Sequence, residues 1–151
     1  MTMINKHSSS KDFVAKLSTD IIKLFDLNFK SKNIYIGGTN KKHIKKRHKK
    51  EFDKYVDKLP EIIKEPTYIG VHPKQGGIEF IKKYKENVLV AVRASKNDVL
   101  YVRSIYFITQ SKIDKYLEER TIKKIKPWIL ALFNKIRGLL VGRRVPHLFI
   151  P

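Results

Sequence analysis

The stretch IEFIKKYKENVLVAVRASKNDVLYVRSIYFI, residues 78–108, predicts most of the fold. It contains three runs rich in Val, Ile, Phe and Tyr, which are typical of β-strands: Ile78–Tyr84, Val88–Ala94 and Leu100–Ile108. The polar segments between the runs have the lengths of hairpin loops, so neighbouring strands should pair antiparallel. A similar run before them, Tyr68–His72, adds a fourth strand. The stretch therefore predicts a four-strand meander.

The hairpin lengths also predict which residues share a face of this sheet. A tight turn at Lys85-Glu86 would pair Phe80 with Ala91, and the next turn would pair Arg93 with Leu100. A slip of one residue would exchange the partners, because side chains alternate between faces. With this register, one face carries Arg93, Ser104 and Tyr106 and the other carries Glu79 and Arg103.

The chain before the meander is expected to be mainly helical. Ser10 predicts the cap of a helix from Lys11 to about Asp26, whose apolar residues recur at helical spacing. The short β-like run Asn33–Ile36 follows and ends at a glycine pair. Thr39 or Asn40 would then cap a second amphipathic helix that runs to about Leu59.

The whole chain is expected to be an α+β protein, with N-terminal helices packed on a four- to five-stranded antiparallel sheet. Thr109 opens a last helix of the domain, Gln110 to about Arg120. We expect a flexible leader at 1–9, the α+β domain at 10–120, and a basic amphipathic C-terminal helix or tail at 121–151. Packing on its own domain is the expectation for that tail, ahead of binding a partner or a membrane.

Positive charge is the largest anomaly of the composition. The 151 residues include 33 Lys or Arg and only 14 Asp or Glu, which gives a net charge of +19. Such a charge indicates a polyanionic partner, and KKHIKKRHKK (Lys41–Lys50) concentrates it. The residues expected to bind nucleic acid are Lys42, Lys45, Lys46, Arg47, Lys50 and Arg103.

The chain has no cysteine, no apolar leader and no run long enough for a membrane span, so we expect a cytoplasmic protein.

The chain also carries the residues that RNA cleavage without a metal ion or cofactor needs. Such cleavage requires a base for the 2′-hydroxyl, an acid for the leaving 5′-oxygen, and cations for the phosphate. His43 or His48 could transfer protons, with Glu79 as a carboxylate base. Arg93, Arg103 and Arg47 could hold the phosphate, and hydroxyls come from Ser104, Tyr106 and Thr109.

Other kinds of site are less well supported. The two histidines are five residues apart, roughly 140° around a helix, which disfavours a shared metal ion. The acidic residues are too scattered for a two-metal nuclease. The remaining alternative is a non-catalytic RNA- or DNA-binding protein that uses the same arginines, and composition alone does not favour catalysis over binding.

Four segments in order carry a family resemblance: IYIGGTNKKHIKKRH, LPEIIKEPTYIGVHPKQGGIEFIKKY, VLVAVRA and LYVRSIYFIT. Over residues 33–117 the chain resembles the phage- and mobile-element-associated Barnase–EndoU–colicin–RelE-like nucleases. The resemblance implies a metal-independent ribonuclease, whose RNA products would end in a 2′,3′-cyclic phosphate, and a toxin-like role restrained by an acidic antitoxin protein. Carried over by motif, it implies roles for His43 and His48, Arg93, and Ser104, Tyr106 and Thr109.

Overall fold

The computed structural model describes residues 4–72 and 77–125, and in them a single mixed sheet has seven strands. The strand order is β1-β2-β6-β5-β4-β3-β7. The strands are β1 (Asp12–Lys16), β2 (Asn33–Ile36), β3 (Tyr68–His72), β4 (Gly77–Lys83), β5 (Asn87–Ala94), β6 (Leu100–Ile108) and β7 (Ile122–Lys124). The α+β class is confirmed, but the sheet has more strands than the sequence predicted.

The meander β3–β6 is confirmed, because its strands pair antiparallel in chain order and begin and end within a residue or so of the predicted positions. The prediction of a wholly antiparallel sheet is wrong. β2 runs parallel to β6, with Ile34 opposite Leu100 and Tyr35 opposite Tyr101. Several helices and the strands β3, β4 and β5 separate β2 from β6 in the chain, and such a long connection permits parallel pairing.

The predicted register of the meander is also wrong, in both hairpins. Lys83 pairs with Asn87, so three residues, and not two, form the first loop, and Glu79 lies opposite Ala91. In the second hairpin Ala91 pairs with Ser104, and an irregularity follows that makes Val92 pair with Val102. The extra residue in β6 is a β-bulge, a feature that changes which way the following side chains point.

The first predicted helix, Lys11 to about Asp26, is wrong. The structure has β1 there, antiparallel to β2, followed by the short helix α1 (Thr19–Leu24). Val14 and Ala15 of β1 are buried, and the Ser18 side chain caps α1 by accepting from the backbone N–H of Asp20. Short apolar runs fit a helix or a strand equally well, and here pairing with β2 decides for the strand.

The second predicted helix is interrupted. It is divided into α2 (Gly38–Arg47), α3 (Lys49–Tyr55) and a 3₁₀ turn η1 (Val56–Lys58), and a further helix, α4 (Leu59–Lys64), follows where the predicted helix ends. The break falls at His48, whose φ of −137° and ψ of 55° are not helical. The predicted cap is wrong as well, because Gly37 is the N-cap and Asn40 Oδ1 accepts from the Gly37 N–H.

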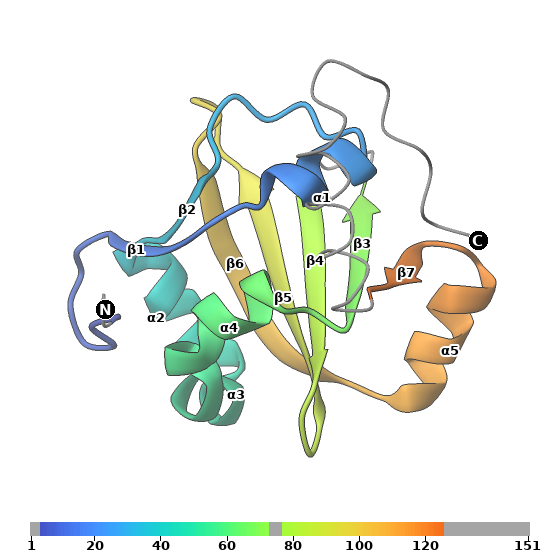
Figure 1. Cartoon of the computed structure of the whole chain (residues 1–151). Helices are drawn as coiled ribbons and strands as arrows, with labels where there is room; N and C mark the ends of the chain where they lie inside the picture. Colours follow the sequence, from blue (N-terminus) through green and yellow to red (C-terminus); the bar gives the residue numbers. More distant parts are fainter. Residues whose placement is uncertain (1–3, 73–76, 126–151) are drawn as a thin grey trace.

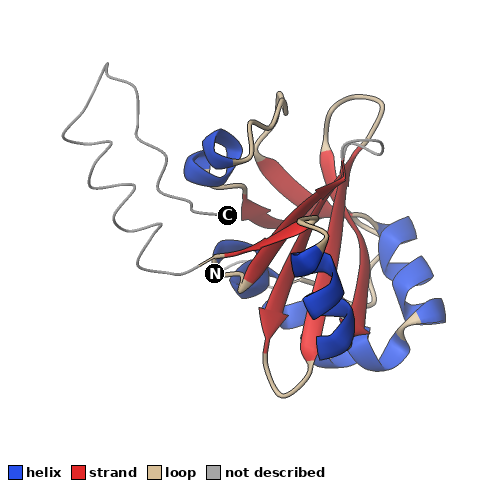
Figure 2. Cartoon of the chain, turned by 90° about the vertical axis from the view of Figure 1, so that its right-hand side faces the viewer, coloured by secondary structure: helices blue, strands red, loops and turns tan. Residues whose placement is uncertain are grey.

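Two hydrophobic cores lie on opposite faces of the sheet. The larger one packs the sheet against α1, α3 and α4, and Figure 1 shows α1 and α4 in front of the strands. The smaller core includes Ile81, Leu89 and Ile113, and packs the other face against the predicted last helix, α5 (Gln110–Glu118). Figure 2, seen from the side of α5, shows helices on both sides of the strands.

Both ends of the described chain are attached to the domain. Residues 4–9, part of the expected flexible leader, lie against the helices: Ile4 is buried, and Lys6 Nζ lies 3.2 Å from the carbonyl oxygen of Asp53. The predicted C-terminal tail begins as β7, which pairs with β3, while its helical stripe beyond Ile125 lies outside the described residues.

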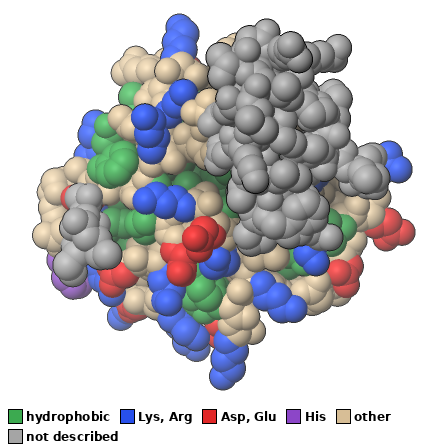
Figure 3. Space-filling view, viewed as in Figure 1, with side chains coloured by type: hydrophobic (Ala, Val, Ile, Leu, Met, Phe, Trp, Pro, Cys, Tyr) green, Lys and Arg blue, Asp and Glu red, His purple; other side chains and the backbone are tan. Residues whose placement is uncertain are grey.

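No helix within the described ranges is long and apolar enough to cross a membrane. Lys and Arg side chains are spread over the face shown in Figure 3.

Candidate active-site cleft

A cleft of about 810 Å³ opens on the face of the sheet that carries the smaller core. Its helical wall consists of Thr39, Asn40 and His43 of α2, with Tyr116 of α5. Its floor consists of Glu79 of β4, Ala91, Arg93 and Ala94 of β5, and Arg103, Ser104 and Tyr106 of β6. The cleft therefore draws on three adjacent strands and on two helices that are far apart in the chain.

The observed register assembles the floor of this cleft. Glu79, Ala91 and Ser104 lie opposite one another on β4, β5 and β6, and Arg93 lies two residues further along β5 on the same face. The predicted register had placed Glu79 on the face opposite Arg93 and Ser104. At the centre the small side chain of Ala91 leaves room between the polar groups.

Gly77 gives the Arg93 side chain its space. The two residues are partners across β4 and β5, and a Cβ atom at position 77 would lie 3.2 Å from Cγ and 3.8 Å from Nε of Arg93. Such a Cβ would be closer than ordinary van der Waals contact allows. The side chain of Arg93 therefore packs over Gly77, because glycine has no side chain to occupy that space.

Arg103 reaches the cleft because of the bulge in β6. The pairs Ala91–Ser104 and Val92–Val102 leave Arg103 without a partner of its own on β5. A bulged residue turns its side chain away from the regular alternation. As a result Arg103 and its neighbour Ser104 both line the cleft, and the cleft contains two guanidinium groups, which suit bidentate contacts to phosphate oxygens.

The hydroxyl of Tyr106 is held in its protonated form. Burial of the half-buried side chain raises the pKa of Tyr106 to about 12, and the negative charge of Glu79 adds to the effect, while Arg93 opposes it. Tyr106 is therefore a hydrogen-bond donor at neutral pH. It is not available there as a base.

The position of α2 places His43 at the cleft. β2 pairs with β6 over only two residue pairs. Both α2 and α3 also contact β6, so α2 lies next to the strand that forms part of the cleft floor. At the start of α2, Gly38 lies so close to the N-terminal segment that a Cβ there would be 2.1 Å from the carbonyl oxygen of Ser9. Glycine at this position permits the approach of the two backbones.

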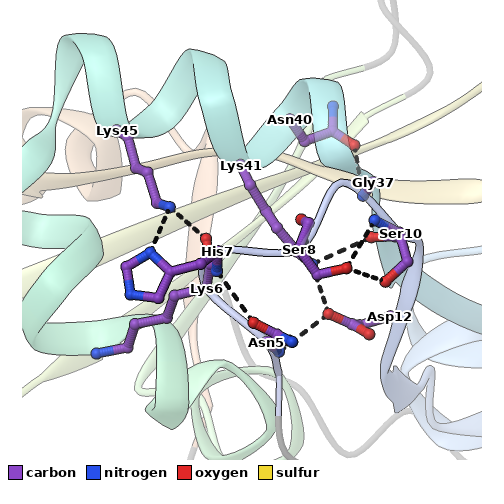
Figure 4. A network of polar contacts seen from close by, with 10 residues as sticks. All are labelled: Asn5, Lys6, His7, Ser8, Ser10, Asp12, Gly37, Asn40, Lys41 and Lys45. Atoms are coloured by element: carbon purple, nitrogen blue, oxygen red, sulfur yellow. Dashed lines mark hydrogen bonds and ion pairs between the residues drawn. The ribbon is translucent and has the colours of Figure 1, made fainter.

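Two lysines of the basic block hold the N-terminal segment against α2, as Figure 4 shows. Lys41, only 2% exposed, donates to the carbonyl oxygens of Ser8 and Ser10 and forms an ion pair with Asp12. Lys45 donates to the carbonyl oxygen of Lys6. The four other basic residues predicted to bind nucleic acid from this block are exposed: Lys42, Lys46, Arg47 and Lys50. The basic block therefore has a structural part and a solvent-facing part.

Two of the predicted catalytic residues do not line the cleft. His48 Nδ1 lies 3.1 Å from Glu51 Oε2, and its ring packs against Tyr106 with ring centres 5.7 Å apart. Thr109 caps α5 by accepting from the backbone N–H of Lys112. His48 thus contacts a residue of the cleft without lining it, and the Thr109 hydroxyl serves as a helix cap.

Five of the seven predicted catalytic residues do come together in the cleft: His43, Glu79, Arg93, Ser104 and Tyr106. The sequence reasoning missed Thr39, Asn40 and Tyr116 as lining residues. Thr39 and Asn40 had been assigned only as alternative helix caps, and Tyr116 lies within the predicted last helix, for which no site residue was expected. The glycine pair before the helix was the available signal that Thr39 and Asn40 line a site. It marks a helix N-terminus directly after a β-strand, and such a terminus brings backbone N–H groups and small polar residues close to the sheet.

The assembled groups suit proton transfer at a phosphate. A carboxylate, an imidazole, two guanidinium groups and a protonated phenol face one cleft. Among residues 4–72 and 77–125, no three His, Asp or Glu side chains form a group that could hold a metal ion.

Comparison with known proteins gives one match. Residues 11–115 match the model of a family described as phage-Barnase-EndoU-ColicinE5/D-RelE like nuclease 3. Curated proteins and solved structures give no match. The matched range includes every predicted catalytic residue and most of the described chain, but Tyr116 lies just beyond it.

Proposed function

Because this chain belongs to the phage-Barnase-EndoU-ColicinE5/D-RelE like nuclease 3 family, we propose that it is an endoribonuclease that cleaves RNA without a metal ion. The family supports nuclease activity and a nucleic-acid substrate. The choice of RNA and of the chemical route is our proposal. The observation that carries it is the presence of Glu79, His43 and two arginines in one cleft.

The proposed reaction is attack of a ribose 2′-oxygen on the adjacent phosphorus. Glu79 takes the proton of the 2′-hydroxyl, and the protonated imidazole of His43 gives a proton to the 5′-oxygen as its bond to phosphorus breaks. The products are a 2′,3′-cyclic phosphate and a free 5′-hydroxyl. Solvent then removes the proton from Glu79 and returns one to His43, so the reaction needs no protein nucleophile and no co-reactant.

The cationic and hydroxyl groups of the cleft would stabilise the phosphorane. Arg93 and Arg103 supply two planar forks, which match the oxygens of a phosphate better than ammonium groups do. Tyr106 is a donor at neutral pH because its pKa is raised to about 12, and the Ser104 hydroxyl lies on the same floor. Fixed donors directed at developing negative charge are usually the largest contribution to catalysis.

His48 receives a different role in this proposal. Its ring lies against Tyr106, and its Nδ1 lies 3.1 Å from Oε2 of Glu51, the carboxylate that accepts a hydrogen bond from the ring. We assign it as a positioning residue for the Tyr106 ring. His48→Gln should therefore lower kcat less than His43→Gln does, and Tyr106→Phe should make the His48 substitution nearly silent.

The test is incubation of the purified chain with total tRNA and rRNA in EDTA, followed by analysis of the fragment ends. Fragments ending in 2′,3′-cyclic phosphate are expected, with a loss of about 100-fold or more in His43→Gln and in Glu79→Gln. His7→Gln is the matched control, because His7 lies outside the cleft.

Intact RNA together with a clear mobility shift would favour a non-catalytic nucleic-acid-binding protein. That result requires one check, because a toxin-like nuclease would have to be restrained in the cell that makes it. An acidic protein bound over the cleft is the partner we expect for a chain of net charge +19. Purification under denaturing conditions and refolding removes such an inhibitor before the assay.

A further inference from the structure

A row of aromatic side chains crosses the sheet from the cleft to its far edge. Arg93 pairs with Tyr101, Tyr101 pairs with Tyr35, and Tyr35 pairs with Phe13, each on the neighbouring strand. Directly paired residues lie on the same face of a sheet. The row therefore begins at an arginine of the cleft and continues across β6, β2 and β1.

This row lies on the cleft side of the sheet. Val92, Ile34 and Leu100, which alternate with row residues along the strands, are fully buried in the larger core on the opposite face. The three rings are only partly buried. A Cβ atom at Gly37 would lie 3.8 Å from Cε1 of Tyr101, so the row also touches the start of α2, where Thr39 and Asn40 line the cleft.

The rings contact one another and a cation. The ring centres of Phe13 and Tyr35 are 5.9 Å apart with an edge-to-face arrangement, and those of Tyr35 and Tyr101 are 6.4 Å apart. Lys11 Nζ lies 4.5 Å from the centre of the Tyr35 ring. Asp12, which neighbours both Lys11 and Phe13, is paired with Lys41. The acidic group next to the row is therefore already neutralised.

We propose that Tyr101, Tyr35 and Phe13 form a stacking site for unpaired bases of the strand whose phosphate occupies the cleft. This inference rests on the proposed function and specifies its substrate as single-stranded RNA that continues from the cleft toward β1. Partly exposed rings bind the faces of unstacked bases, and the adjacent cations bind the backbone. Bases inside a duplex have no free face to offer.

Charge complementarity favours nucleic acid as the occupant. Arg93 lies at the cleft end of the row, and Lys11 lies beside its middle ring, so a strand following the row would meet a cation at both places. Stacking is tolerant of sequence because every base has an aromatic face. The row should therefore select unpaired over paired RNA without selecting a particular base.

The first experiment measures binding without cleavage. Single-stranded DNA of about 12 nucleotides serves as the probe, since it lacks the 2′-hydroxyl that the proposed reaction needs, and a blunt duplex of the same length is compared with it. We expect Tyr35→Leu and Tyr101→Leu each to weaken single-strand binding by about tenfold and to change duplex binding little. Tyr35→Phe should bind normally, and Phe107→Leu is the control for an exposed ring outside the row.

The second experiment separates this inference from the proposed function. Cleavage of a dinucleotide, which is short enough to occupy the cleft alone, is compared with cleavage of a longer single-stranded RNA. The Leu variants should lose rate on the long RNA at low concentration and keep the wild-type rate on the dinucleotide.

Each outcome decides one of the two proposals. Normal single-strand binding by folded Leu variants would overturn the stacking site and would show that the row only stabilises the pairing of β1, β2 and β6, with the nuclease proposal untouched. No cleavage by the wild-type chain, with single-strand binding that depends on Tyr35 and Tyr101, would overturn the nuclease proposal and keep the stacking site. Thermal melting of each variant confirms that it is folded.

Discussion

The ammonium group of Lys41 lies 2.5 Å from Oδ2 of Asp12, and this pair joins β1 to the first turn of α2. Lys41 is almost fully buried, and its two further hydrogen bonds go to backbone carbonyl oxygens of the N-terminal segment. A buried ammonium with three acceptors is well satisfied. The pair therefore holds in place the helix that carries His43.

Replacing Lys41 should destabilise the fold strongly. Lys41→Met leaves Asp12 without its cationic partner and two carbonyl oxygens without their donor, and we expect a loss of about 3 kcal/mol in the free energy of unfolding. Urea denaturation followed by circular dichroism measures the loss. Lys42→Met, at the exposed neighbouring position, should change stability by less than about 0.5 kcal/mol. Equal stability of the two variants would mean that the buried pair is dispensable.

The same pair predicts how stability depends on pH. The hydrogen bond from Lys41 lowers the pKa of Asp12, against the effect of burial, and the Asn5 N–H adds to the lowering. Because the folded pKa lies below the unfolded one, the pair stabilises the fold fully above the ordinary carboxyl pKa of about 3.9, and this stabilisation is lost as the pH falls through the folded value.

The difference in melting temperature between wild type and Lys41→Met should accordingly be constant from about pH 7 to pH 5 and shrink below about pH 4. Asp12→Asn removes the titrating group, so the difference in melting temperature between Asp12→Asn and the double variant Asp12→Asn/Lys41→Met should not change over the same pH range. A difference that stays constant down to pH 3 would show that Asp12 is not the group responsible.

The two adjacent glycines before α2 should respond differently to alanine. At Gly38 a Cβ would lie 2.1 Å from the backbone oxygen of Ser9, whereas at Gly37 its nearest contact is 3.1 Å from a side-chain atom of Asn40. We expect Gly38→Ala to cost about 1–3 kcal/mol, as forced overpacking does, and to loosen residues 4–10. Hydrogen exchange of that segment is the measurement. Similar protection in the Gly38 and Gly37 variants would contradict the close approach.

Tyr106 should act as a proton-bearing donor and not as a base. Its pKa is raised to about 12 by burial and by the charge of Glu79, so Glu79→Gln should lower it and Tyr106→Phe should remove that titration altogether. Difference titrations of phenolate absorbance test both statements. Tyr106→Phe should reduce kcat by about tenfold at neutral pH. A wild-type rate that climbs steadily toward pH 12, and a variant rate that does not, would indicate a phenolate base instead.

The sequence predicted the meander well because its runs of Val, Ile, Phe and Tyr are long and are separated by short polar segments. It also identified most of the cleft residues by their chemistry. Glu79 was placed on the wrong face because one extra loop residue, Tyr84, shifts the first hairpin, and a shift by one residue exchanges the faces of a strand. Arg103 was placed on the wrong face because of the bulge in β6. Loop length is decided by backbone geometry that a residue pattern does not specify.

Two other features depend on contacts that are distant in the sequence. β1 is a strand because β2 lies beside it, and its apolar residues alone are equally compatible with a helix. Lys41 belongs by composition to a run of solvent-facing cations, yet it is buried because Asp12 and two carbonyl oxygens surround it. The local residue pattern specifies neither the pairing of β1 with β2 nor the contacts of Lys41. The sequence analysis therefore treated the lysines of this block alike, as solvent-facing cations.

Gly77 is expected to act on catalysis through Arg93. Gly77→Ala would place a Cβ 3.2 Å from Arg93 Cγ and push the guanidinium group from its place over the cleft floor. We expect kcat for RNA cleavage to fall by about tenfold, a decrease similar to that in Arg93→Lys, which keeps the charge but loses the planar fork. In the double variant the second substitution should add little. Additive losses in kcat would instead show that Gly77 and Arg93 contribute independently, and that the close contact has no catalytic consequence.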